Sequence, residues 1–273
     1  MKFKFLGTAA AEGIPALFCT CKNCEYARKH KGKNIRTRFS ILIDDSYKID
    51  FPPDSYFHLV KYNLDYTKLK SVFITHDHSD HFQEYEFGMM HKYFTNERNL
   101  KINIYGNEVV VEKLKYLTNT KDGINQPNVV RVKSLDVIED NNYQVTVLPA
   151  DHNSRGEPFI YYFYNKKENK SFLCAHDTGY FKDEVWEFLK DKRLDVISLD
   201  GTALCFSQKE SHLGFDGIFM VKERLEKENI IDKKTKFIIN HFSHNPQMNH
   251  KQIVKYVKNK GIIVAYDGMD LKV

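Results

Sequence analysis

Ile74-Thr75-His76-Asp77-His78-Ser79-Asp80-His81-Phe82 is the stretch around which the chain is organised. The β-branched and apolar residues Ser71–Thr75 lead into it and predict a strand. Extended residues two apart point to the same side, so His76 and His78 can reach one metal ion. Asp80 and His81 fall where we expect a helix to begin, turned toward a second ion. The spacing predicts a two-metal site at a strand end, and the alternative is a histidine-rich polar turn.

The length fits one large α/β domain or two small ones, and because no linker marks a boundary we expect a single domain over residues 1–273. The formal charge is +5, with lysines scattered rather than clustered, so we do not expect a nucleic-acid partner. The first residues do not have the pattern of a targeting signal, and no apolar run is long enough to cross a bilayer. We therefore expect a soluble, cytoplasmic protein without a membrane partner.

Strands and helices alternate along the chain. The pattern predicts strands at Lys2–Leu6, Phe39–Asp44, Ser71–Thr75, Ile102–Tyr105, Pro158–Asn165, Ser171–Ala175, Leu194–Leu199, Thr235–Asn240 and Gly261–Tyr266. From Val129 to Pro149 the pattern is also β, and it ends in the strand Tyr143–Leu148. It predicts helices at Glu25–Lys31, Tyr56–Tyr62, Gln83–Phe94, Val109–Leu117, Asp183–Leu189, Phe215–Lys227 and Asn249–Asn259, and a hairpin turn at Asp267-Gly268. This order fits two mixed sheets covered by helices.

Three further potential ligands follow predicted strands, as His76 does. They are His152, Asp177 and His241. A lone histidine after a strand is usually structural, but four strand ends that offer metal ligands point to one shared site.

The cysteines form a second cluster, C-T-C-K-N-C, at Cys19, Cys21 and Cys24. Without a secretion signal, this spacing favours a metal over disulfides, and the alternative is a reduced surface cluster. Arg36 and Arg38 could hold a phosphate, or they could be surface charge beside a strand.

The motif His76-Asp77-His78-Ser79-Asp80-His81, followed by His152, Asp177 and His241, resembles the metallo-β-lactamase superfamily. The resemblance implies a four-layer αββα sandwich with a dinuclear site. It implies that His76, His78 and His152 hold one ion, that Asp80, His81 and His241 hold the other, and that Asp177 bridges them. His176 is the alternative to Asp177, but a bridge favours a carboxylate. The ligand set suits Zn and also accepts Mn or Fe.

A narrower resemblance is to the phosphodiesterases of the carbon–phosphorus lyase pathway (PhnP-like), which cleave a ribosyl cyclic phosphate. It rests on Gly7-Thr8, Glu12-Gly13, Pro15, the three cysteines and His241-Phe242-Ser243-His244. It implies a structural zinc on Cys19, Cys21, Cys24 and His244, with His250 as the alternative fourth ligand. Ala9-Ala10-Ala11 is less glycine-rich than this family's loop. By resemblance, His212 contacts the phosphate or protonates the leaving oxygen.

These resemblances imply a metal-dependent phosphodiesterase. Its substrate would be a small cyclic phosphate or a nucleotide-like phosphodiester, attacked by a hydroxide that bridges two Zn or Mn ions and is oriented by Asp80. One alternative is a ribonuclease resembling the transfer-RNA 3′-end nuclease, whose A-x-D-T-G-Y stretch is similar to Ala175–Tyr180. Two others are a protein like the B protein of pyrroloquinoline quinone biosynthesis and a metal-binding protein without catalysis. A homodimer is expected from the family resemblance alone.

Overall fold

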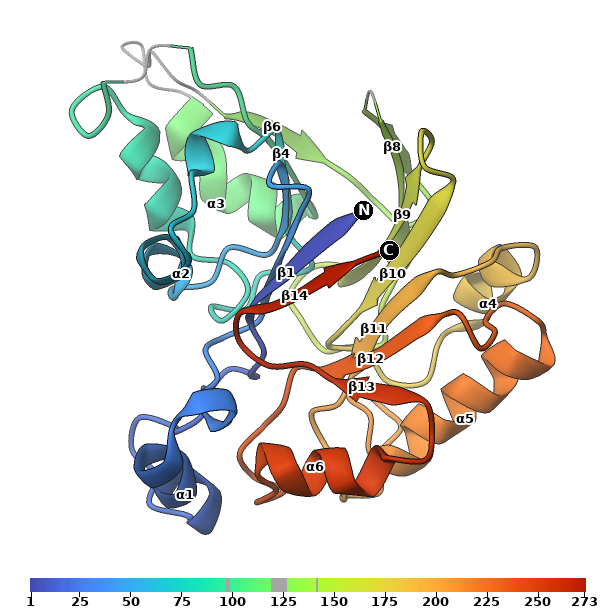
Figure 1. Cartoon of the computed structure of the whole chain (residues 1–273). Coiled ribbons are helices and arrows are strands. Elements are labelled where there is room, and N and C mark those ends of the chain that lie inside the picture. Colours follow the sequence, from blue (N-terminus) through green and yellow to red (C-terminus); the bar gives the residue numbers. More distant parts are fainter. Residues whose placement is uncertain (97–98, 119–126, 141) are drawn as a thin grey trace.

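The computed structural model describes residues 1–96, 99–118, 127–140 and 142–273, which form two mixed β-sheets packed face to face (Figure 1). The first sheet has seven strands. In spatial order they are β14 (Met269–Lys272), β1 (Lys2–Gly7), β2 (Ser40–Ile43), β3 (Tyr47–Ile49), β4 (Ser71–Phe73), β5 (Asn103–Gly106) and β6 (Asn128–Arg131). Strands β14, β1, β2 and β3 pair antiparallel, whereas β3 to β6 pair in parallel.

The second sheet also has seven strands and places three parallel strand ends side by side. In spatial order its strands are β13 (Ile262–Val264), β12 (Lys236–Asn240), β11 (Val196–Asp200), β10 (Lys170–Ala175), β9 (Phe159–Asn165), β8 (Tyr143–Pro149) and β7 (Val137–Glu139). Because β10, β11 and β12 are parallel and in register, their carboxyl ends at Ala175, Asp200 and Asn240 meet at one edge.

Helices cover the outer faces of both sheets (Figure 1). The first sheet carries α2 (Ser55–Tyr62), the 3₁₀ helix η3 (Glu84–Met90) and α3 (Glu108–Thr118); the second carries α4 (Asp183–Leu189), α5 (Phe215–Lys227) and α6 (His250–Val257). The chain also forms α1 (Lys22–His30), η1 (Gly32–Asn34) and η2 (Tyr66–Lys68). A buried cluster that includes Phe3, Phe73, Tyr161 and Phe172 fills the space between the sheets. The predicted αββα sandwich is thereby confirmed.

Alternation along β10 shows how one strand contributes to two of the buried clusters. In β10, Phe172 and Cys174 face the core between the sheets, while Leu173 and Ala175 face the core under the helices. Both faces are buried, which is why this strand reads as an almost continuous apolar run.

Three local predictions differ from the structure. No helix begins at Asp80; His78 O instead accepts hydrogen bonds from the amides of His81 and Phe82, which makes a tight turn. The helix expected over Gln83–Phe94 is the shorter 3₁₀ helix η3. Asp267-Gly268 does form a turn, but it connects β13 of one sheet to β14 of the other, so it does not close a hairpin.

Within the residues that the structure describes, no helix has both the length and the apolar character needed to cross a bilayer.

Candidate metal centres

The first candidate centre consists of three histidines from two strand ends. His76 and His78 follow β4, and His152 follows β8. Nε2 of His76 lies 2.9 Å from Nδ1 of His78, and Nε2 of His152 lies 3.4 Å from the same Nδ1. Three imidazole nitrogens that converge in this way can bind one Zn²⁺ or a similar divalent ion.

The second candidate centre combines two carboxylates with two histidines. Its members are Asp80, His81, Asp177 and His241. Nε2 of His81 lies 2.7 Å from Oδ2 of Asp177, 3.1 Å from Oδ2 of Asp80 and 3.2 Å from Nε2 of His241. All four side chains are buried. This set offers nitrogen and oxygen donors to a second ion.

Asp177 lies between the two centres. Its Oδ2 is 3.5 Å from Nε2 of His76 in the first centre and 2.7 Å from Nε2 of His81 in the second. Its backbone has φ 46°, and His241 has φ 63°, both in the left-handed region that costs energy for a residue with a Cβ. The two strained residues follow β10 and β12, where they turn their side chains into the site.

Four histidines are oriented by a partner on their other ring nitrogen. In His76, Nδ1 lies 3.0 Å from Thr75 Oγ1, and in His81 it lies 2.6 Å from Asp50 Oδ2. In His152, Nδ1 lies 3.2 Å from Ser211 O, and in His241 it lies 2.8 Å from Thr202 Oγ1. Each partner leaves Nε2 directed at the centre. Ligand histidines in metalloproteins are held in the same way.

The chemistry of this donor set fits divalent cations. Asp177 Oδ1 is buried and accepts no hydrogen bond from the described residues. Burial opposes a charge on His81, but Asp80, Asp177 and Asp50 outweigh it and hold the pKa of His81 well above its ordinary value. The buried carboxylates of the cluster therefore strongly stabilise positive charge beside them, and two bound cations would supply that charge.

His212 and Asp200 lie beside the second centre. Nδ1 of His212 is 3.3 Å from Asp177 Oδ1 and 3.4 Å from Asp200 Oδ2. With Asp177 and His241 they form an overlapping group that could also hold an ion. Asp200 was not predicted, although it ends β11 just as the other ligands end their strands. Asp50 was also missed, because nothing local in sequence links it to His81.

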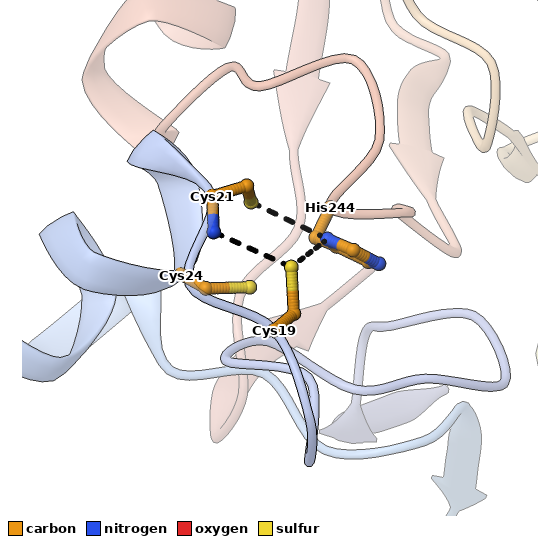
Figure 2. A group of neighbouring side chains, drawn as sticks. All are labelled: Cys19, Cys21, Cys24 and His244. Carbon is orange, nitrogen blue, oxygen red and sulfur yellow. Dashed lines mark hydrogen bonds between the residues drawn. The ribbon is translucent and has the colours of Figure 1, made fainter.

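The cysteine cluster lies between α1 and the loop after β12. The side chains of Cys19, Cys21, Cys24 and His244 converge in Figure 2, with His244 Nδ1 3.5 Å from Cys19 Sγ and 3.4 Å from Cys21 Sγ. Burial raises the pKa of Cys24 to about 12, and its two neighbouring cysteines reinforce the shift. For Cys21, the hydrogen bond with His244 and those with the neighbouring cysteines overcome burial and lower the pKa to about 6. The pKa shifts of Cys21 and Cys24 go in opposite directions, so the thiols do not ionise alike without a cation. A zinc ion, which favours the thiolate form of every cysteine that it binds, fits this set of three thiols and one imidazole.

Two histidines that were considered as alternatives have other partners. His176 Nε2 lies 2.9 Å from Ser198 Oγ, and its Nδ1 lies 3.3 Å from Cys174 Sγ. His250 Nδ1 lies 3.0 Å from Arg36 Nη2. Neither belongs to a group of converging donors among the described residues. Asp177 and not His176 therefore joins the second centre, and His244 and not His250 joins the cysteine cluster.

A cavity of about 380 Å³ opens over the centres. Its lining is Ala10, Ala11, Glu12, His78, Asp80, His152, Asp177, Thr202, Ala203, Phe206, Gln208, His212, His241, Ser243, Asn245 and Pro246. Arg36 and Arg38 are outside this lining, contrary to a role in binding phosphate. Arg36 is buried and donates to Thr8 Oγ1 and Ala265 O, each at 2.7 Å, and Arg38 pairs with Asp54 at 3.2 Å.

Comparison with known proteins identifies the family and the fold. The model of the beta-lactamase superfamily domain matches residues 41–231. The fold is similar to that of a diphosphatase from the PhnP family, with TM-score 0.74, 21% identity, and coverage of 100% of this chain and 97% of that chain. It is also similar to Zn²⁺-bound PqqB from Methylobacterium extorquens, with TM-score 0.76, 14% identity and 100% coverage of both chains. For human tRNase Z, short form, the TM-score is 0.68 and the identity 18%, with coverage of 100% of this chain and 99% of that one.

These structural similarities show the fold, and the family model shows the family to which the chain belongs. A search of curated protein sequences gives no significant match. The family model spans well over half of the chain and includes His76, His78, Asp80, His81, His152 and Asp177. The chain therefore belongs to the beta-lactamase superfamily, and its site has the donor chemistry of a metal-dependent hydrolase.

Proposed function

We propose that this protein is a phosphodiesterase that hydrolyses a small cyclic phosphate or a nucleotide-like phosphodiester. The observation that carries the proposal is the position of Asp177 between two groups of donors, with His212 at its side in the same cavity. Two ions about 3.5–4 Å apart are suited to in-line displacement at phosphorus. The cavity volume of about 380 Å³ suits a small molecule.

The two centres would hold the ions through the residues already described. His76, His78 and His152 would bind one, Asp80, His81 and His241 the other, and Asp177 both. Bound there, the ions would supply Lewis acidity and lower the pKa of a water molecule. Zn and Mn both suit these nitrogen and oxygen donors. Cys19, Cys21, Cys24 and His244 would hold a separate structural zinc.

The protein's own groups would position the substrate and move protons. Asp80 lines the cavity beside His81 and can orient the attacking water. His212 is held at Nδ1 by Asp200, while Nε2 has no partner among the described residues. Because His212 also lines the cavity, Nε2 can donate a proton to the leaving oxygen.

Hydrolysis of a chromogenic phosphodiester tests the proposal. The protein, stripped of metal and reloaded with Zn or Mn, is expected to turn over bis(p-nitrophenyl) phosphate. His81→Ala removes a ligand of the second centre and is expected to lower kcat/KM by about 100-fold, the upper end of the loss seen when a residue that only supports a metal ligand is removed. His30→Ala, an exposed histidine on α1, is the matched control and keeps wild-type turnover.

The outcomes of this assay test the proposed reaction and the second centre separately. Turnover that needs metal and is lost only in His81→Ala supports the phosphodiesterase. Full activity in His81→Ala would contradict the assignment of the second centre. If protein with a full complement of ions hydrolyses no phosphodiester, the proposed reaction is wrong.

A further inference from the structure

One wall of the cavity has no part in the hydrolysis described above. It consists of Glu12 from the N-terminal loop and Ser243 and Asn245 from the loop after β12, and we call it the Glu12 wall. Ser243 Oγ donates to Glu12 Oε1 at 2.6 Å, and Asn245 Nδ2 donates to the same oxygen at 3.4 Å. These contacts fix the carboxylate at the cavity surface.

The cysteine cluster gives the Glu12 wall a further support. His244, whose Nδ1 faces Cys19 and Cys21, places its Nε2 3.5 Å from Glu12 Oε1. A ligand histidine that pairs its second nitrogen with a carboxylate is held rigidly, and the carboxylate is held in return. Glu12 is thus positioned from the loop that also carries His241.

The second oxygen of Glu12 is available to a ligand. Oε2 accepts no hydrogen bond from any residue that the structure describes, whereas Oε1 has three neighbouring donors. A carboxylate accepts hydrogen bonds and cannot donate them. A substrate that covers Oε2 must therefore bring a hydrogen-bond donor, or it leaves a charged acceptor without a partner.

The negative charge of the Glu12 wall disfavours substrates that carry a second phosphate. Among the described residues that line the cavity, none is a lysine or an arginine, and Glu12 adds a negative charge away from the two centres. Phosphate groups are bound by cationic side chains or metal ions. A second phosphate on the substrate would therefore meet a carboxylate with no compensating side chain.

We propose that the Glu12 wall selects phosphodiesters that carry a free hydroxyl, and no second phosphate, on the part remote from the scissile bond. The inference rests on the proposed phosphodiesterase activity and narrows its substrate class to phosphates of polyols such as sugars or glycerol. The hydroxyl donates to Glu12 Oε2 while the scissile phosphate lies at the two centres.

Three cyclic phosphates test this selection in metal-loaded protein. Glycerol 1,2-cyclic phosphate and propane-1,2-diol cyclic phosphate differ by one hydroxyl, and the third carries a phosphate on that hydroxyl. The wild type is expected to favour the first over the second by about tenfold in kcat/KM, the effect of one hydrogen bond to a charged group. It is expected to act poorly on the third.

Glu12→Gln is the decisive variant because it keeps the shape of the side chain. Its amide oxygen can still accept from Ser243, but the charge and the second acceptor are lost. The tenfold preference should fall toward one, mainly through KM, and kcat/KM for the substrate with the second phosphate should rise. A structural defect would lower all three values together. Glu25→Gln, an exposed residue of α1, should leave the preference intact.

Binding of the products gives a second measurement that does not need turnover. Calorimetry compares the Kd of glycerol phosphate with that of propanediol phosphate, in wild type and in Glu12→Gln. A preference that Glu12→Gln leaves unchanged overturns the inference, even where hydrolysis itself proceeds. If the wild type hydrolyses neither these three substrates nor bis(p-nitrophenyl) phosphate, the proposed reaction fails, and the ratio of Kd values alone then decides the role of Glu12.

Discussion

Lys48 is a charged residue enclosed in the first sheet, close to the residue that orients His81. Its Nζ donates to Asp50 O and to Ser40 Oγ, each at 2.6 Å, and its side chain is fully buried. Burial lowers its pKa to about 7, although the charge of Asp50 opposes that shift. The sequence pattern predicted no strand at Tyr47–Ile49, so only the folded structure shows that this lysine is enclosed.

The unfolding free energy should therefore depend on pH through Lys48. Its pKa is about 7 in the folded protein and 10.5 by the ordinary value, so between these pH values the unfolded chain binds more protons. Stability then rises from pH 7 to 10.5, by at most about 1.4 kcal/mol per pH unit, and levels off below pH 7.

Lys48→Met should remove this contribution. Urea denaturation between pH 7 and 10 measures the unfolding free energy of both proteins. The value for Lys48→Met minus the value for the wild type should be largest near pH 7 and should decrease as the pH rises. Lys251→Met, an exposed residue of α6, should keep the wild-type slope. The same slope in wild type and Lys48→Met would show that the folded lysine keeps its ordinary pKa.

At the scale of single elements, strand ends were the predictable part of the site. His76, His152, Asp177 and His241 each follow a strand whose apolar run is visible in sequence. Arg36 could not be placed in the same way. Its partners Thr8, Ala265 and His250 come from opposite ends of the chain, so only the folded structure shows that this guanidinium is enclosed.

The turn after β4 was mispredicted for a related reason. The sequence suggested a helix from Asp80, but Phe51 and Phe82 form a bridge between distant segments. The amide of Phe51 donates to His81 O at 2.7 Å, and that of Gln83 donates to Phe51 O at 2.8 Å. These tertiary contacts outweigh local helix propensity, so a turn and the Phe82 bridge precede η3 in place of a helix from Asp80.

We predict that helix α1 depends on the cysteine cluster. It has nine residues, fewer than an isolated helix needs for stability in water, and Cys24 is one of its three buried residues. Cys24→Ala should therefore speed hydrogen exchange of the α1 amides by about tenfold or more, because a structural zinc contributes its binding energy to folding.

Cys205→Ala is the matched control for this element, since Cys205 is exposed and lies outside the cluster. Its α1 amides should exchange as in the wild type. Removal of zinc with a chelator should reproduce the effect of Cys24→Ala. Unchanged exchange in both cases would mean that packing alone holds α1.

In the whole molecule, the two centres join the two sheets at one edge. His76, His78, Asp80 and His81 follow β4 of the first sheet, whereas His152, Asp177 and His241 follow strands of the second. Ions held by both sets would link the sheets in addition to the apolar core between them. Because the unfolded chain does not present these donors together, such ions stabilise the folded state as a whole.

Loading with metal should therefore raise Tm for both sheets together. At a metal concentration 100-fold above Kd the gain is about 2.7 kcal/mol, which corresponds to a rise of roughly 5 °C or more in a chain of this size. Trp186, the single tryptophan, is buried on α4 against the second sheet, so its fluorescence reports that half while circular dichroism reports both. The two transitions should move together in the wild type and move less in His81→Ala. A shift in circular dichroism without one at Trp186 would mean that the ions stabilise only the first sheet.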